Sequence, residues 1–106
     1  LIDKFLIIPI FLYSCSGVDA RQFPPDPKER VKKNLEDTKL SSDDIDEVIM
    51  GCVLPAGLGQ APARQVSIGA GIPVTVGATT INKMCGSGMK SIMMGYDSIE
   101  SGTNKI

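Results

Sequence analysis

The sequence of 106 residues contains no histidine and no tryptophan, and its three cysteines form no C-x-x-C pair. Ligands for a structural zinc site are therefore missing, and an odd number of scattered cysteines does not indicate a disulfide framework. Free cysteines are typical of a reducing compartment, so we expect a cytoplasmic protein without a bound metal. Because histidine is absent, this chain alone cannot assemble the Cys–His pair that activates many nucleophilic thiols.

An excess of charge of one sign is also missing. Eleven lysines and arginines stand against twelve acidic residues, which gives a formal net charge of −1. A nucleic-acid surface needs clustered positive charge, and the two tyrosines and three phenylalanines are too scattered to form a platform for base stacking. The apolar run at residues 5–13 is shorter than the roughly 20 residues that span a bilayer. We therefore expect neither a nucleic-acid partner nor a membrane partner.

The first part of the chain differs in composition from the rest. Residues 5–13 fit a buried strand bent at Pro9, a translated stretch foreign to the protein, or the apolar core of an export signal. In the last case, Cys15 would carry a lipid anchor. Residues 21–28 are rich in proline and are predicted to be a linker, because proline disfavours both regular helix and central strand.

The remaining residues alternate between helical and strand patterns. Apolar periodicity and turn residues predict, in order, a helix over 27–40, a capping or turn cluster at 41–44, a strand over 48–54, a loop at 57–60, a short helix from 61 that ends near 69–71, a strand over 74–81 and a final helix that stops at Gly102. This order predicts an α/β layered fold, in which ligands bind at the carboxyl edge of the strands.

The final helix carries one apolar stripe. Its members recur at positions i, i+3, i+4, i+7 and i+10, and they are Met89, Ile92, Met93, Tyr96 and Ile99. We expect this stripe to face the core.

Residues 79–90 read TTINKMCGSGMK and place Cys85 just before the first turn of the final helix. Unpaired N–H groups and the positive end of the helix dipole favour an anion there, and a thiolate is such an anion. The glycines that follow allow a sharp turn and close approach of a substrate. Two interpretations remain open: Cys85 is a catalytic nucleophile, or the helix start binds a phosphate or carboxylate without catalysis. Cys15 and Cys52 are predicted to be small buried apolar residues.

The glycines do not form a nucleotide-binding loop. Met89 separates Gly88 from Lys90, whereas a P-loop needs lysine directly after glycine. Ser91 stands where the pattern G-x-G-x-x-G requires its third glycine.

Three segments resemble the N-terminal part of thiolases, and specifically of acetyl-CoA acetyltransferases. They are residues 45–51 (IDEVIMG), residues 53–65 (VLPAGLGQAPARQ) and residues 80–90 (TINKMCGSGMK). The match runs without a gap from about Lys28 to the end, whereas residues 1–27 contain nothing like the Arg-Thr-Pro segment of thiolases. The resemblance implies a thiolase-like layered αβαβα fold, with residues 28–106 as part of its N-terminal domain. Residues 1–27, an apolar segment and a Pro-rich linker, are either a divergent end of a thiolase or belong to another reading of the gene.

The resemblance also implies an activity. In thiolases, the cysteine that matches Cys85 takes the acyl group from one coenzyme A thioester, and a second thioester then accepts it. The backbone N–H of Cys85 would help to hold the thioester oxyanion. The NKMCGSG form is similar to that of thiolases that join two acetyl-CoA units or cleave acetoacetyl-CoA. Coenzyme A thioesters would be substrates, with no permanently bound cofactor, and the full-length enzyme would be a homodimer or homotetramer.

We expect the sequence to be a piece of a longer protein. It opens on Leu1 rather than methionine, and no closing element follows the final helix. The resemblance implies that the activating histidine, a second catalytic cysteine and most of the coenzyme A pocket lie further along a longer chain. The isolated piece is therefore expected to be inactive.

Overall fold

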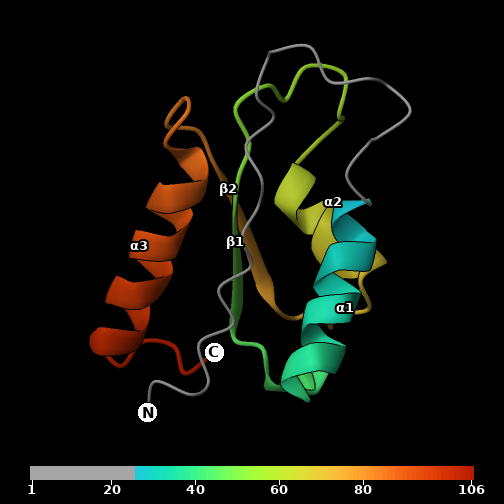
Figure 1. Cartoon of the computed structure of the whole chain (residues 1–106), viewed down its shortest axis with the longest axis vertical. Coiled ribbons are helices and arrows are strands. Elements are labelled where there is room, and N and C mark those ends of the chain that lie inside the picture. Colours follow the sequence, from blue (N-terminus) through green and yellow to red (C-terminus); the bar gives the residue numbers. More distant parts are fainter. Residues whose placement is uncertain (1–25) are drawn as a thin grey trace.

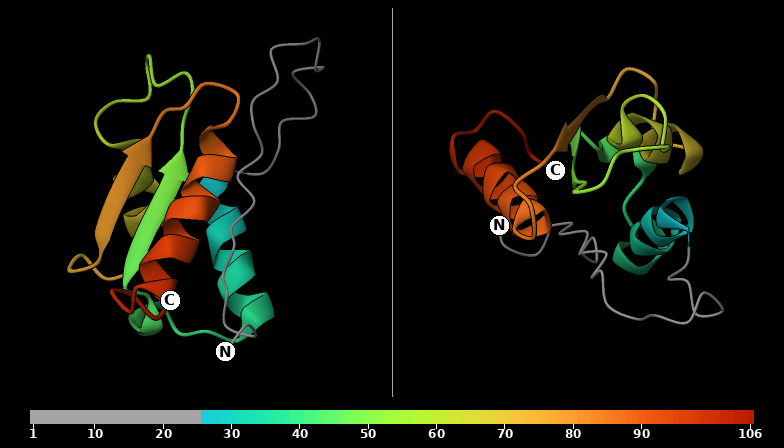
Figure 2. Two further views of the ribbon diagram at one scale, coloured as in Figure 1. Left: turned by 90° about the vertical axis from the view of Figure 1, so that its left-hand side faces the viewer. Right: turned by 90° about the horizontal axis from the view of Figure 1, so that it is seen from above.

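The computed structural model describes residues 26–106 and has three layers, with a small sheet between helices (Figure 1). The elements are α1 (Pro27–Thr38), the 3₁₀ helix η3 (Ser42–Asp44), β1 (Glu47–Gly51), α2 (Pro62–Gly69), β2 (Gly77–Ile81) and α3 (Ser87–Glu100). Helix α3 covers one face of the sheet, and α1 and α2 lie on the other (Figure 2). The predicted α/β layered fold is confirmed.

Helix α1 begins and ends as its sequence dictates. The Asp26 carboxylate accepts a hydrogen bond of 3.0 Å from the backbone N–H of Lys28, and Pro27 occupies the first turn, where its missing N–H costs nothing. The predicted linker therefore extends two residues too far, because Pro27 and Lys28 are helical. At the other end, Lys39 adopts a left-handed conformation with φ 56°, and Leu40 N–H donates to the Leu35 carbonyl.

The two strands pair in parallel, from Glu47 opposite Gly77 to Gly51 opposite Ile81. Both are shorter than predicted. Strand β1 ends at Gly51, where it pairs with Ile81, the last residue of β2, and the N–H of Cys52 donates the last hydrogen bond of this pairing to the Ile81 carbonyl. Cys52 is half-buried and follows the strand, so the prediction that it lies buried within a strand is wrong.

Strand β2 starts late because the preceding residues form a turn. The Val76 N–H donates to the Pro73 carbonyl at 3.0 Å. The Arg64 guanidinium donates to the carbonyls of Val74 (2.6 Å) and Val76 (2.7 Å), which removes both acceptors from any strand ladder. Apolar composition alone predicts strand here, and the arginine overrides it.

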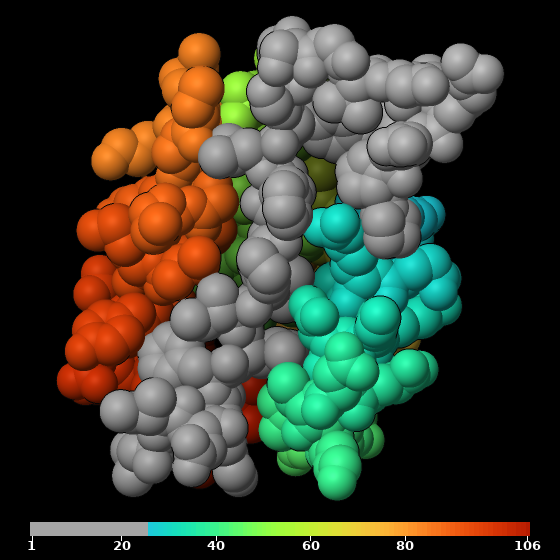
Figure 3. Space-filling model, in the orientation of Figure 1, coloured from blue at the N-terminus to red at the C-terminus, as the bar shows by residue number. Residues whose placement is uncertain are grey.

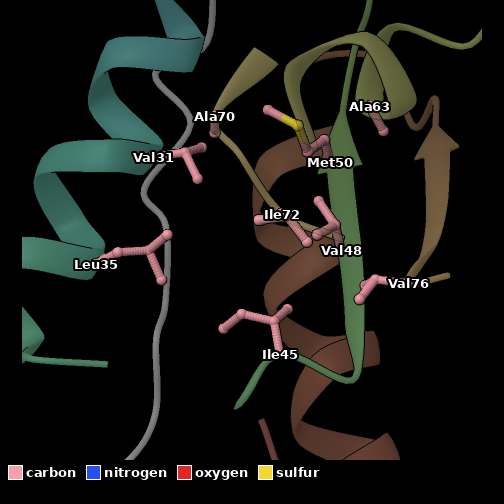
Figure 4. Packing of buried hydrophobic residues seen from close by; sticks show 9 residues of the cluster. All are labelled: Val31, Leu35, Ile45, Val48, Met50, Ala63, Ala70, Ile72 and Val76. Carbon is pink, nitrogen blue, oxygen red and sulfur yellow. The ribbon is translucent and has the colours of Figure 1, made fainter. Parts of the chain in front are cut away.

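The core lies between the sheet and the two helices α1 and α2. It consists of nine buried apolar residues: Val31, Leu35, Ile45, Val48, Met50, Ala63, Ala70, Ile72 and Val76 (Figure 4). Val48 and Met50 point to the same side of β1 because side chains alternate along a strand. The predicted pair Val31 and Leu35 is confirmed as the buried face of α1.

Helix α3 is present as predicted, but it buries a different face. Met89, Met93 and Tyr96 are 63%, 50% and 51% exposed, whereas the buried residues of the helix are Ser87 and Ser91. The prediction that the apolar stripe faces the core is therefore wrong within residues 26–106. The physical reason is distance, since α3 approaches β1 so closely that small side chains are needed between them.

Helix α3 ends where glycine predicts its end. Gly102, with φ 76°, donates to the Ile99 carbonyl, and Thr103 N–H donates to the Ser98 carbonyl.

In the space-filling view, α3 and α1 form opposite flanks of the molecule (Figure 3). Among residues 26–106, no helix combines the length and the apolar character that crossing a membrane requires. The predictions for residues 1–20, including the lipid anchor at Cys15, lie outside the described residues.

Candidate active site

Cys85 lies in the turn that connects β2 to α3, at the carboxyl end of the parallel sheet. Its side chain is exposed, and the next residue, Gly86, is the N-cap of α3. Gly86 brings no side-chain cap, so the positive end of the helix begins beside Cys85 without a competing oxygen from that position. The structure thus places Cys85 where the sequence predicts it.

The backbone immediately before Cys85 is strained. Met84 has φ 46°, in the left-handed region that residues with a side chain rarely adopt. Such a residue costs on the order of 1–3 kcal/mol and persists only where its surroundings hold it in place. Strained positions of this kind are common at functional sites.

Asn82 holds the N–H of Met84. Its side-chain oxygen accepts that N–H at 2.9 Å, and its side-chain nitrogen donates to the Val53 carbonyl at 3.2 Å. The orientation of the amide is unambiguous, because the opposite one would set donor against donor and acceptor against acceptor. Asn82 therefore ties the turn to the segment that follows β1.

Ser87 holds the carbonyl of Met84. Its hydroxyl donates to the Met84 carbonyl at 2.6 Å and accepts the N–H of Lys83 at 2.8 Å. The residue is only 1% exposed, so both bonds are shielded from water. The Gly86 N–H donates to the Lys83 carbonyl at 3.0 Å and closes the turn.

Gly51 leaves space for this arrangement. A Cβ atom at Gly51 would lie 2.4 Å from the Ser87 carbonyl carbon and 2.6 Å from the Gly88 nitrogen. Both are backbone atoms, which cannot swing aside. The end of β1 and the first turn of α3 therefore touch directly through their main chains.

The neighbouring helix α2 is attached to strand β2. Thr80 of β2 accepts the Ala63 N–H at 3.0 Å, and this bond replaces the side-chain cap that Ala61 cannot supply. The Gln65 amide donates to the carbonyls of Leu58 and Gln60, which orders the loop before α2. Thr80 and Gln65 are therefore structural supports on the side of the sheet away from α3.

Sequence reasoning identifies Cys85 and misses the residues that hold it. Asn82 could have been recognised, since an asparagine that accepts the N–H two residues later forms a common turn motif. Gly51 and Ser87 could not, because their contact joins two elements that are far apart in the sequence. Among residues 26–106 the other cysteine is Cys52, whose backbone N–H donates to the Ile81 carbonyl at the end of β2.

Fold and site together define an α/β protein with an exposed cysteine on a strained strand-to-helix turn, a class suited to nucleophilic chemistry at sulfur. The family profile described as the thiolase N-terminal domain matches residues 27–106. The chain belongs to the thiolase family.

Individual relatives agree with this assignment. A cytosolic acetyl-CoA acetyltransferase of Gibberella zeae is 49% identical over 76 residues, which are 72% of this chain and 19% of that protein. A probable acetyl-CoA acyltransferase of Staphylococcus aureus is 53% identical over 72 residues, which are 68% of this chain and 18% of that protein.

A solved structure has a similar fold. A thiolase of Ascaris suum, crystallised in complex with coenzyme A, superposes with a TM-score of 0.69 and 40% identity, over 74% of this chain and 20% of its own. The chain thus spans about a fifth of the length of the relatives it matches.

Proposed function

We propose that this chain is the N-terminal part of an enzyme that transfers acyl groups between coenzyme A thioesters, with Cys85 as the nucleophile. The observation that carries the proposal is the exposed Cys85 on a strained turn at the start of α3, in a chain of the thiolase family. The relatives named acetyl-CoA acetyltransferase and the structure with coenzyme A support the substrate class.

In the proposed reaction, the Cys85 thiolate attacks the carbonyl carbon of an acetyl thioester. The carbonyl oxygen becomes an oxyanion, which the backbone N–H of Cys85 helps to stabilise. When the oxyanion collapses, the bond to the coenzyme A sulfur breaks, the coenzyme A thiolate leaves and takes up a proton, and an acetyl-Cys85 enzyme remains. A second acetyl-CoA then loses a proton from its methyl carbon to a base, this carbon attacks the carbonyl of the acetyl-Cys85 enzyme, and the Cys85 thiolate leaves as acetoacetyl-CoA forms. The reverse sequence cleaves acetoacetyl-CoA.

The proton that leaves Cys85 needs a base, and the sequence contains no histidine to act as one. We propose that the base, a second catalytic cysteine and most of the coenzyme A pocket belong to other parts of a longer enzyme. The isolated chain of 106 residues is then inactive in acyl transfer. We further propose that residues 28–106 belong to the thiolase domain, and that the enzyme is a cytoplasmic homodimer or homotetramer.

Labelling tests the role of Cys85. The full-length enzyme is incubated with radiolabelled acetyl-CoA and quenched in acid, and its peptides are mapped by mass spectrometry. We expect the acetyl group on the peptide that contains Cys85, no label in Cys85→Ser, and unchanged labelling in the matched variant Cys52→Ser. An active enzyme with label at another residue, or a Cys85→Ser variant with normal turnover, would refute the proposal. Retained ligand binding with no loss of function in Cys85→Ser would instead favour a non-catalytic anion site.

A further inference from the structure

The two peptide units on either side of Met84 are each held by hydrogen bonds. In the unit before Met84, the Lys83 carbonyl accepts the Gly86 N–H, and the Met84 N–H donates to Asn82. In the unit after Met84, the carbonyl accepts from both the hydroxyl and the N–H of Ser87, at 2.6 and 3.1 Å. Since φ and ψ describe how these two units are rotated about Met84, the bonds determine its left-handed conformation.

The second of these units also contains the N–H of Cys85. A trans peptide is planar, and its C=O and N–H point in opposite directions. The Met84–Cys85 bond is trans, and its carbonyl points at the Ser87 hydroxyl in the first turn of α3. The Cys85 N–H therefore points away from Ser87.

We infer that Asn82 and Ser87 are positioning residues, which aim the Cys85 N–H at the oxygen of a thioester that the Cys85 sulfur attacks. The inference rests on the proposed function, in which that N–H stabilises the oxyanion. Neither side chain needs to touch the substrate. Asn82 fixes the orientation of the peptide unit before Met84, and Ser87 fixes the orientation of the unit after it. Removal of either side chain therefore lets the Cys85 N–H turn away from the oxyanion.

The test separates two reactions of the same sulfur. Transfer of an acetyl group from acetyl-CoA to Cys85 passes through an oxyanion, whereas alkylation of Cys85 by iodoacetamide replaces iodide at a saturated carbon and forms none. Rapid-quench acylation and iodoacetamide alkylation are therefore measured on the full-length enzyme and on its Ser87→Ala and Asn82→Ala variants. We expect acylation to slow by roughly 10- to 100-fold, because a misaligned oxyanion donor loses much of its effect. The alkylation rate and the KM for acetyl-CoA are expected to stay unchanged.

Two further variants serve as matched controls. Ser91 lies one turn further along α3, is also buried, and its hydroxyl donates to the Gly88 carbonyl, so Ser91→Ala makes the same chemical change away from the turn. It is expected to acylate at the wild-type rate. Asn82→Asp keeps an acceptor for the Met84 N–H and should restore the ratio of acylation to alkylation toward that of the wild type.

Each outcome bears on a different statement. A wild-type enzyme that carries no acetyl group on Cys85 refutes the proposed function itself. A wild type acylated at Cys85, with variants that acylate equally fast or that lose acylation and alkylation in parallel, refutes the positioning role alone. If Ser87→Ala does not fold, Asn82→Ala decides, because Asn82 is exposed and its replacement leaves the core intact.

Discussion

Cys85 owes its position to a glycine on another element. Gly51, the last residue of β1, lies against the backbone of Ser87 and Gly88, so the first turn of α3 rests on the strand without any side chain between them. Ser87 in turn bonds both residues that precede Cys85. A change at Gly51 is therefore transmitted to the cysteine through main-chain atoms.

We predict that Gly51→Ala destabilises the protein and displaces the turn. The added methyl group would lie 2.4 Å from the Ser87 carbonyl carbon, which forces the helix away from the strand. The free energy of unfolding should fall by about 1–3 kcal/mol, the usual cost of overpacking. Urea denaturation followed by circular dichroism measures this loss.

Gly77→Ala is the matched control. Gly77 is the first residue of β2, has an ordinary backbone conformation, and a Cβ atom there would meet nothing within 4 Å. Its replacement should leave the free energy of unfolding almost unchanged. Equal losses in the two variants would contradict the idea that close approach is what requires glycine at position 51.

At the scale of elements, helix α3 shows that an apolar stripe does not identify the buried face. Its buried residues are Ser87 and Ser91, whereas Met93 on the stripe is 50% exposed. Met50 on β1 belongs to the core and is 6% exposed. The same side chain is therefore buried in the core at Met50 and half exposed to solvent at Met93.

We predict that truncation of these methionines has unequal effects in the 106-residue chain. Met50→Ala should lower the free energy of unfolding by about 2–5 kcal/mol, because it leaves a cavity in the core. Met93→Ala should lower the free energy of unfolding by about 1 kcal/mol or less, because much of the Met93 side chain is already in contact with water and little buried apolar surface is removed. Thermal and urea denaturation of both variants provide the comparison, and equal losses would show that something covers the α3 stripe.

The order of helices and strands could be predicted because each element has local signals. Val31 and Leu35 share one helix face, Pro62 suits a first turn, and Gly102 ends α3. Strand boundaries could not be predicted, because they depend on partners: Arg64 removes the acceptors of Val74 and Val76, and no local pattern reveals this.

The candidate site likewise has one part that the sequence predicts and another that only the structure reveals. Cys85 stands out from its neighbours in sequence, whereas its supports act across distance. The bond from Asn82 to Val53 joins residues 29 positions apart, and only the folded chain brings them together.

At the scale of the whole molecule, one carboxylate connects the end of the described chain to the sheet. The Asp46 carboxylate accepts the N–H of Lys105 at 2.7 Å and that of Ile106 at 3.2 Å, and the Asp46 N–H donates to the Ile106 carbonyl. The two backbone donors, first Lys105 and then Ile106, hold the pKa of Asp46 below its ordinary value of 3.8.

We predict that this contact makes stability depend on pH in the acidic range. A carboxyl group whose pKa is lower in the folded state stabilises that state above the unfolded value, and the contribution is lost as pH falls through the folded value. Wild type should therefore be more stable than Asp46→Asn at neutral pH, and the difference should shrink below pH 3.8. Thermal midpoints of both proteins between neutral and acidic pH test this, and a constant difference would contradict it.

The parallel pairing of β1 and β2 has a consequence for the order of assembly. Parallel neighbours need a crossover, and here α2 and its loops separate strands whose paired residues, such as Glu47 and Gly77, lie 30 positions apart. Contacts between distant segments form slowly, because the intervening chain must first close into a loop. The turn around Cys85 depends on such contacts through Val53 and Gly51. In a newly made chain, the Cys85 thiol is therefore not held in its turn until β1 and β2 have paired.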